Sequence, residues 1–123
     1  MTRPQPWWLA WPVAEVAAAI LPLFSQSSHV GEERVMKAIV GWCKTGSFRL
    51  PAMYRQSAAP RFEDPDLRAI AEAIQVLEHS RLLMRADQGD SESALGLTRL
   101  GMQALQTNTV REQLGLGDGP PTA

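Results

Sequence analysis

Few side chains in this sequence could do chemistry, and none is spaced for catalysis. The chain has one cysteine and two histidines. Cys43 falls on the apolar side of an expected helix, a position that predicts a core thiol rather than a nucleophile. His29 and His79, with only this cysteine between them, do not make a metal-binding arrangement. We therefore expect neither an enzyme nor a bound metal or other cofactor.

Basic residues are concentrated in one stretch, although the formal net charge of the chain is −1. Between Arg34 and Phe62 the sequence carries six Lys or Arg residues and no Asp or Glu. Such a stretch can attract a polyanion, although a solvated surface is the simpler interpretation. The segment from Asp87 to Glu92 is acidic instead, so charge alone does not decide between these interpretations.

Helical periodicity accounts for most of the chain. A helix is expected from Pro12 to the next proline at position 22, and a second from Glu32 or Glu33 to Lys44, where Gly46 ends it. A third, best-defined helix follows Pro65 and runs to His79, with Asp64 or Asp66 as its cap. One side of this third helix is apolar and the other carries a polar stripe of Arg68, Glu72, Gln75 and His79.

A β-hairpin is expected after the third helix. The segments Leu82 to Ala86 and Ala94 to Leu97 have strand character, and the residues between them are turn formers. Thr98 then caps a final helix, which we expect to run to about Leu114 and to end at Gly115. Residues 25–31 and most of residues 47–66 predict irregular structure, with one short helix that has Pro51 in its first turn.

Two segments resemble known regulators. "IQVLEHSRLLMR" (residues 74–85) and "LGLTRLGMQAL" (residues 95–105) resemble the recognition helix, wing and last helix of bacterial regulators of the PadR and MarR kinds. Residues 33–85 also resemble the winged-helix modules of phage and plasmid primase-helicase proteins. The resemblance implies a mainly α, winged helix-turn-helix fold, with a three-helix core, a β-hairpin wing, and extra N-terminal and C-terminal helices. Where many relatives have a glycine after the recognition helix, this chain has Ser80 and Arg81, so Arg81 either adopts the left-handed conformation or the helix ends differently.

The resemblance further implies a small cytoplasmic DNA-binding protein, dimeric and of bacterial, plasmid or phage type, acting in transcription regulation or replication. Arg68 and Gln75 would read base edges in double-stranded DNA, because Arg pairs with guanine and Gln with adenine. The expected phosphate contacts are Arg49, Tyr54, Arg55, Arg61 and Arg85. Acidic residues at the start of the third helix and at the wing tip oppose this function. The alternative is therefore a winged helix used for protein–protein assembly without nucleic acid.

The N-terminal residues do not suggest a membrane anchor. Trp7, Trp8 and Trp11 could anchor a protein interface, although covering the core from the N-terminal side is the simpler interpretation. Prolines and a glutamate interrupt the apolar run from Trp7 to Phe24, which therefore does not predict a membrane helix or a cleaved signal. The lone cysteine is typical of a reducing, cytoplasmic setting. We expect an N-terminal helical extension over residues 1–29, the winged domain over 30–114 and a disordered tail over 115–123. The expected homodimer interface consists of Trp8, Trp11, Val16, Ile20 and Leu105.

Overall fold

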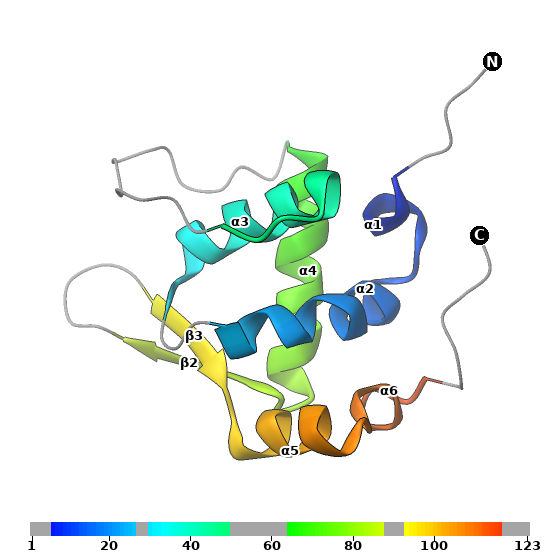
Figure 1. Cartoon of the computed structure of the whole chain (residues 1–123), viewed down its shortest axis with the longest axis vertical. Helices are drawn as coiled ribbons and strands as arrows, with labels where there is room; N and C mark the ends of the chain where they lie inside the picture. The colour runs from blue at the N-terminus through cyan, green and yellow to red at the C-terminus, as the bar shows by residue number, and fades with distance from the viewer. Residues whose placement is uncertain (1–5, 27–29, 50–63, 88–92, 117–123) are drawn as a thin grey trace.

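The structure, a computed structural model, describes residues 6–26, 30–49, 64–87 and 93–116. It is mainly helical, with one small antiparallel sheet (Figure 1). In Figure 1 the long helix α4 runs vertically through the middle of the molecule, and α2 crosses it. None of the helices that the structure describes is long and apolar enough to cross a membrane. The elements in chain order are α1 (Trp7–Ala10), α2 (Val13–Ile20), the 3-10 helix η1 (Leu21–Gln26), β1 (Val30–Gly31), α3 (Glu32–Thr45), α4 (Pro65–His79), β2 (Leu83–Asp87), β3 (Ser93–Leu97), α5 (Arg99–Thr107) and α6 (Val110–Gln113).

Prolines and a glycine lie at or near the ends of the first helices. Helix α2 begins at Val13, one residue after the start at Pro12 that the sequence predicts, and the fixed φ of Pro12 suits the entry into a helix. Pro22 does not end the helical path, because the chain tightens into η1 and continues to Gln26. Gly46 ends α3 as expected, with a left-handed φ of 81° that glycine adopts without steric cost.

The predicted third helix, α4, is confirmed over Pro65–His79. The Asp64 carboxylate accepts hydrogen bonds from the backbone N–H groups of Asp66 (2.9 Å) and Leu67 (3.3 Å), which otherwise have no partner at a helix start. At the other end Arg81 has a left-handed φ of 64°, and the Leu82 N–H donates to the Leu77 carbonyl at 2.9 Å. The first of the two alternatives for Arg81 is therefore the one observed.

The sheet has three strands in the order β1–β3–β2, all antiparallel. β2 and β3 form the expected hairpin, with Leu83 opposite Leu97 and Asp87 opposite Ser93. β1 pairs with the other edge of β3 through Val30 and Gly31. The sequence predicted a loop over residues 25–31, and the strand at its end is a correction: two residues gain ladder hydrogen bonds only because β3, far along the chain, lies beside them.

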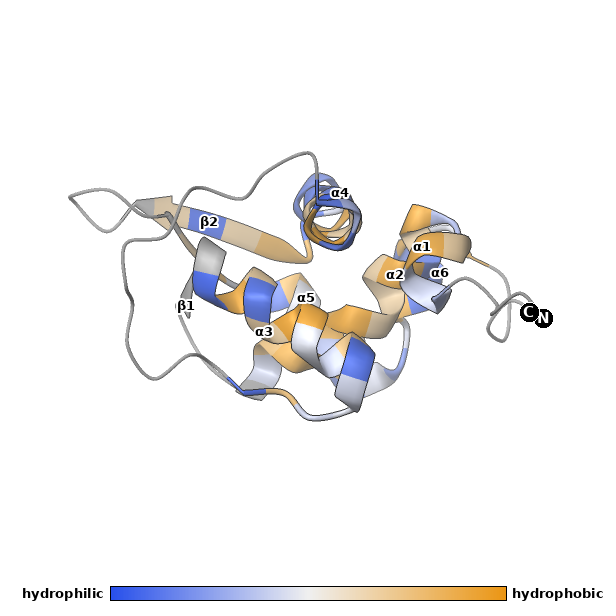
Figure 2. Cartoon of the chain, turned by 90° about the horizontal axis from the view of Figure 1, so that it is seen from above, coloured by the Kyte–Doolittle hydropathy of each residue, from blue (hydrophilic) through white to orange (hydrophobic). Residues whose placement is uncertain are grey.

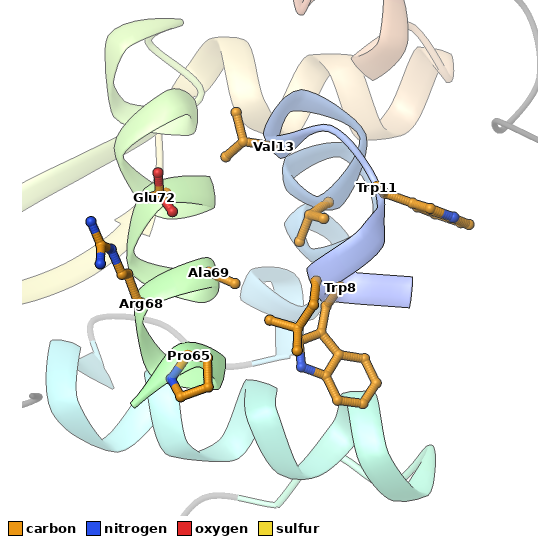
Figure 3. Close-up of a pocket in the computed structure, with 9 residues that line it drawn as sticks. Trp8, Trp11, Val13, Pro65, Arg68, Ala69 and Glu72 are labelled. Atoms are coloured by element: carbon orange, nitrogen blue, oxygen red, sulfur yellow. The ribbon is translucent and has the colours of Figure 1, made fainter. Parts of the chain in front are cut away.

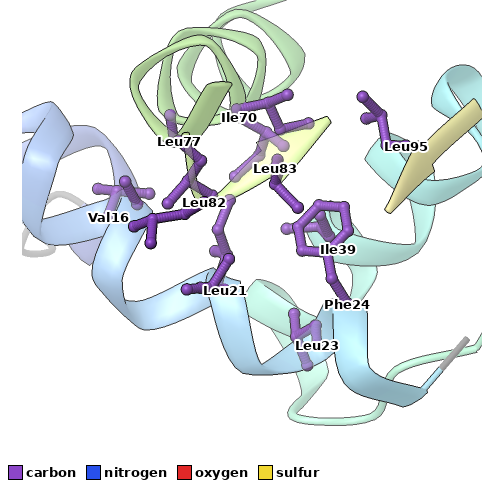
Figure 4. Close-up of a cluster of buried hydrophobic side chains, with 14 of the residues drawn as sticks. Val16, Leu21, Leu23, Phe24, Ile39, Ile70, Leu77, Leu82, Leu83 and Leu95 are labelled. Atoms are coloured by element: carbon purple, nitrogen blue, oxygen red, sulfur yellow. The ribbon is translucent and has the colours of Figure 1, made fainter. Parts of the chain in front are cut away.

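One apolar core unites these elements, including the N-terminal ones. Figure 4 shows side chains from α2, η1, α3, α4 and the hairpin meeting in it. Burying each large aliphatic side chain contributes about 1.5–3 kcal/mol to folding, so this cluster is the main source of stability. The large side chains that are almost fully buried are Val16, Ile20, Leu21, Val35, Met36, Ile39, Ile70, Ile74, Leu77, Leu82 and Leu95.

The final helix is not continuous, which corrects the sequence prediction. Thr98 caps α5 as expected, since its hydroxyl accepts from the Gly101 N–H at 2.9 Å. The helix then stops after Thr107, where Asn108 takes a left-handed φ of 58°, and the separate helix α6 follows. Asparagine tolerates this conformation better than most residues do, so it can end a helix as glycine does.

Candidate nucleic-acid interface

The polar stripe of α4 lies on the molecular surface. Figure 2 views α4 nearly along its axis and shows its hydrophilic side turned away from the other helices. The opposite side of the helix is buried through Ile70, Ala73, Ile74 and Leu77. Because these positions recur every three or four residues, the positions between them form one outward strip. The exposed residues of this strip, called the α4 stripe below, are Arg68, Glu72, Gln75 and His79.

Asp66 fixes the start of α4 against two other helices. Its Oδ1 accepts a hydrogen bond from the indole Nε1 of Trp8 at 2.7 Å, and its Oδ2 lies 3.2 Å from the ammonium of Lys44. One carboxylate therefore joins α1, α3 and α4. From its place in the sequence, Asp66 is expected to be a helix cap or an acid that repels phosphates. Its partnership with Lys44 offsets that charge, and no sequence signal linked it to Trp8, 58 positions away.

Arg85, an expected phosphate contact, is held by a carboxylate. Its Nη2 lies 2.6 Å from Oε1 of Glu78 and its Nε lies 3.2 Å from Oε2. The two bonds form the parallel fork that favours Arg–carboxylate pairs, and they tie β2 to the last turn of α4. The pair is partly exposed, with 34% of the Arg85 side chain accessible. Arg85 therefore positions the hairpin against α4 in the free protein.

The remaining expected phosphate contacts are only partly visible. Arg49 is exposed, three positions after Gly46 at the end of α3. Tyr54, Arg55 and Arg61 lie outside the described residues. Of the expected DNA contacts, the structure thus places Arg68 and Gln75 together on the α4 stripe.

A hollow of about 330 Å³ lies beside the α4 stripe, between α4 and the N-terminal residues. Figure 3 shows Trp8, Trp11 and Val13 on one side of it and Pro65 and Ala69 on the other, with the guanidinium of Arg68 pointing away. The tryptophan rings near α1 pack against one another: the Trp7 ring centroid lies 5.0 Å from that of Trp11 and 5.9 Å from that of Trp42. These edge and tilted contacts favour the simpler of our two expectations, that the tryptophans cover the core.

The residues expected to form a dimer interface lie in two different environments. Val16 and Ile20 are 1% and 0% exposed in a single chain, so their side chains pack inside it and present no area to a second copy. Trp8 is also buried, at 8% exposed. Sequence periodicity shows that such a helix face is buried but not which partner buries it.

Trp11 and Leu105, in contrast, are half-buried and line one hollow of about 510 Å³ between α2 and the last two helices. Arg111 crosses this hollow to Glu15, with 3.0 Å between Nη2 and Oε2, and so ties α6 to α2. No signal in the sequence points to this pair, whose members are 96 positions apart.

Of the nucleophile and metal candidates, the structure describes Cys43 and His79, whereas His29 lies outside the described residues. Burial, and secondarily the carboxylate of Asp66, raises the pKa of the Cys43 thiol to about 11, so it is protonated at neutral pH. Across the described ranges, no group of three His, Cys, Asp or Glu side chains could hold a metal ion.

Comparison of the chain with protein-family models, with curated proteins and with solved structures finds no match.

Proposed function

We propose that this chain is a winged helix-turn-helix protein that binds double-stranded DNA, with α4 in the major groove and the β2–β3 hairpin as its wing. The proposal includes the cytoplasmic role in transcription regulation or replication that the sequence resemblance implies. The α4 stripe carries it: Arg68, Gln75 and His79 are exposed on one helix face. From Arg68 to His79 the stripe is about 16 Å long at 1.5 Å per residue, a length that suits a groove about 12 Å wide.

The connectivity supports the winged-helix part of the proposal. The order is a helix, a short strand, two helices and a hairpin, and the short strand pairs with the second strand of the hairpin. This pairing places β1 on the outer edge of β3 and leaves β2 next to α4, with the Arg85–Glu78 pair between them. A hairpin held in this way beside an exposed helix is the arrangement from which a wing and a recognition helix contact adjacent parts of a duplex.

Two of the acidic residues of α4 are offset by basic partners within the chain. Asp66 and Glu78 have basic partners within the chain, whereas Arg68 has no ion pair in the part that the structure describes. The guanidinium of Arg68 is therefore available to a base edge or a phosphate. Its contact would contribute about 1–3 kcal/mol if it is bidentate to guanine.

The test is fluorescence anisotropy of labelled duplex DNA over a salt series. The wild-type protein should bind at low salt and weaken steeply as salt rises, because binding releases counterions. Arg68→Ala and Gln75→Ala should each weaken binding. Arg99→Ala is the matched control, because Arg99 is an exposed arginine on α5 and its loss changes the net charge equally. If Arg99→Ala and Arg68→Ala weaken binding to the same extent, the effect is one of net charge and the docking of α4 is refuted.

The second candidate function is protein–protein assembly, with a second copy of the chain as partner. The observation that favours it is the larger hollow, where Trp11 and Leu105 leave apolar surface half-exposed. Homodimerisation there is also compatible with DNA binding by α4. Sedimentation equilibrium should show a dimer that Leu105→Ser dissociates. A wild-type protein that stays monomeric at high concentration removes this candidate.

A further inference from the structure

Glu72 is the acidic residue of α4 that has no bonding partner among the residues that the structure describes. The other acids of this helix each have a partner within the chain: Asp64 caps the helix, Asp66 bonds to Trp8 and Lys44, and Glu78 pairs with Arg85. Glu72, in the middle of the α4 stripe, is exposed and forms no hydrogen bond or ion pair in the part of the chain that the structure describes. Even Arg68, one turn earlier, does not pair with it.

The position of Glu72 is unfavourable for a surface that only attracts phosphates. A carboxylate in the centre of a DNA-binding face is repelled by both strands, and in the part of the chain that the structure describes Glu72 forms no ion pair that would offset its charge. The repulsion is compensated only where the carboxylate accepts a hydrogen bond from the DNA. In the major groove the exposed donors are the amino groups of cytosine and adenine, and the carboxylate pairing is with cytosine N4.

The spacing of the α4 stripe fits the reading of neighbouring base pairs. At 1.5 Å per residue, Glu72 lies about 6 Å along the helix from Arg68 and about 4.5 Å from Gln75, against a base-pair rise of about 3.4 Å. With α4 lying in the major groove, each side chain would therefore face its own base pair or the adjacent one. Their chemistry differs: Arg68 donates to guanine, Glu72 accepts from cytosine and Gln75 pairs with adenine.

We infer that Glu72 is a specificity-determining residue, which restricts binding to duplexes that present a cytosine amino group between the guanine read by Arg68 and the adenine read by Gln75. This inference rests on the proposed function and goes beyond it, because it names the base that the site requires. Glu72 acts mainly against other sequences: where the amino group is missing, the carboxylate stays unpaired in a polyanionic groove.

The experiment selects duplexes from a randomised pool with the wild-type protein, and then measures anisotropy for the selected sequence and each single base-pair replacement. The wild type should lose roughly 5- to 150-fold in affinity when the required C·G pair becomes T·A. Glu72→Ala should lose this discrimination at that one position and bind random duplex more tightly than the wild type. Glu72→Gln should also bind random duplex more tightly, because its amide carries no charge.

The control is Glu112→Ala, which removes another exposed carboxylate, on α6, and should leave the base preference intact. If the wild type binds duplex DNA without a cytosine requirement, or if Glu72→Ala keeps it, Glu72 is not a specificity determinant although DNA binding stands. If the wild type binds no duplex at low salt, the proposed function fails and this inference with it. The two failures are thus distinguishable.

Discussion

Residue 101 must be glycine, because α5 lies against the chain entering β2 with no room for a side chain. A Cβ on Gly101 would lie 2.2 Å from the carbonyl oxygen of Leu82 and 3.3 Å from Cδ2 of Leu97. The first distance is far below any van der Waals contact, and the atom concerned belongs to the backbone. That carbonyl also accepts from the Thr98 N–H at 3.1 Å, so it cannot move without loosening the start of α5. Gly101→Ala therefore forces α5 away from the hairpin.

These contacts set the expected loss in the free energy of unfolding of Gly101→Ala. Overpacking of this kind costs about 1–3 kcal/mol, and weakening the Thr98 cap adds about 1 kcal/mol. Alanine regains about 1 kcal/mol through its higher helix propensity. The net loss in the free energy of unfolding is therefore about 2 kcal/mol, which lowers Tm by roughly 8 °C in a domain of this size.

Circular dichroism during guanidinium and thermal unfolding measures this loss. Gly41→Ala is the matched control, because Gly41 lies within α3 and an added Cβ meets nothing within 4 Å there. The control should be neutral or gain up to about 1 kcal/mol. The reasoning is refuted if Gly101→Ala is as stable as the wild type while Gly41→Ala behaves as expected.

Three further predictions concern the same junction and the half-buried thiol of Cys43. Thr98→Ala removes a hydroxyl that accepts from Gly101 N–H and donates to the Arg81 carbonyl, so it should cost about 1–2 kcal/mol in urea unfolding. Arg81→Gly should raise stability by about 0.5–1 kcal/mol in the same assay, since it relieves the left-handed φ; a loss would show that the arginine side chain matters more than its backbone. For Cys43, the folded pKa of about 11 exceeds the ordinary thiol pKa of 9.0, so the unfolded chain releases the thiol proton first as pH rises. The stabilisation that is present below pH 9 should thus be lost between pH 9 and 11. Cys43→Ser lacks this titration, so comparing its stability with that of the wild type isolates the effect. Equal pH profiles of the two proteins would contradict the prediction.

The sequence was sufficient to predict helix starts and caps where several local signals agree. The start of α4 combines a capping Asp64, a proline at the first helical position and a clean apolar face, and each of these acts within one helical turn. The α4 stripe follows from the same periodicity. Thr98 was predictable as the α5 cap for the same reason, because a helix cap depends on residues two or three positions away.

Features that depend on distant partners were not predictable. The two-residue strand β1 exists only because β3 lies beside it, and Asp66 meets Trp8 only after α1 and α4 have packed together. The break at Asn108 contradicts a helical pattern in which no glycine or proline lies near the break. For Val16 the sequence predicted burial but not the partner: the rest of its own chain buries this side chain.

The most direct test of the central claim is an NMR titration of the isotope-labelled protein with duplex DNA, following backbone amide shifts. Docking of α4 predicts that the largest shifts fall on residues 68–79, and that they weaken together as salt is raised. Shifts confined to α1, α5 and α6 at low salt would contradict the docking of α4, and a spectrum unchanged by DNA would contradict DNA binding itself.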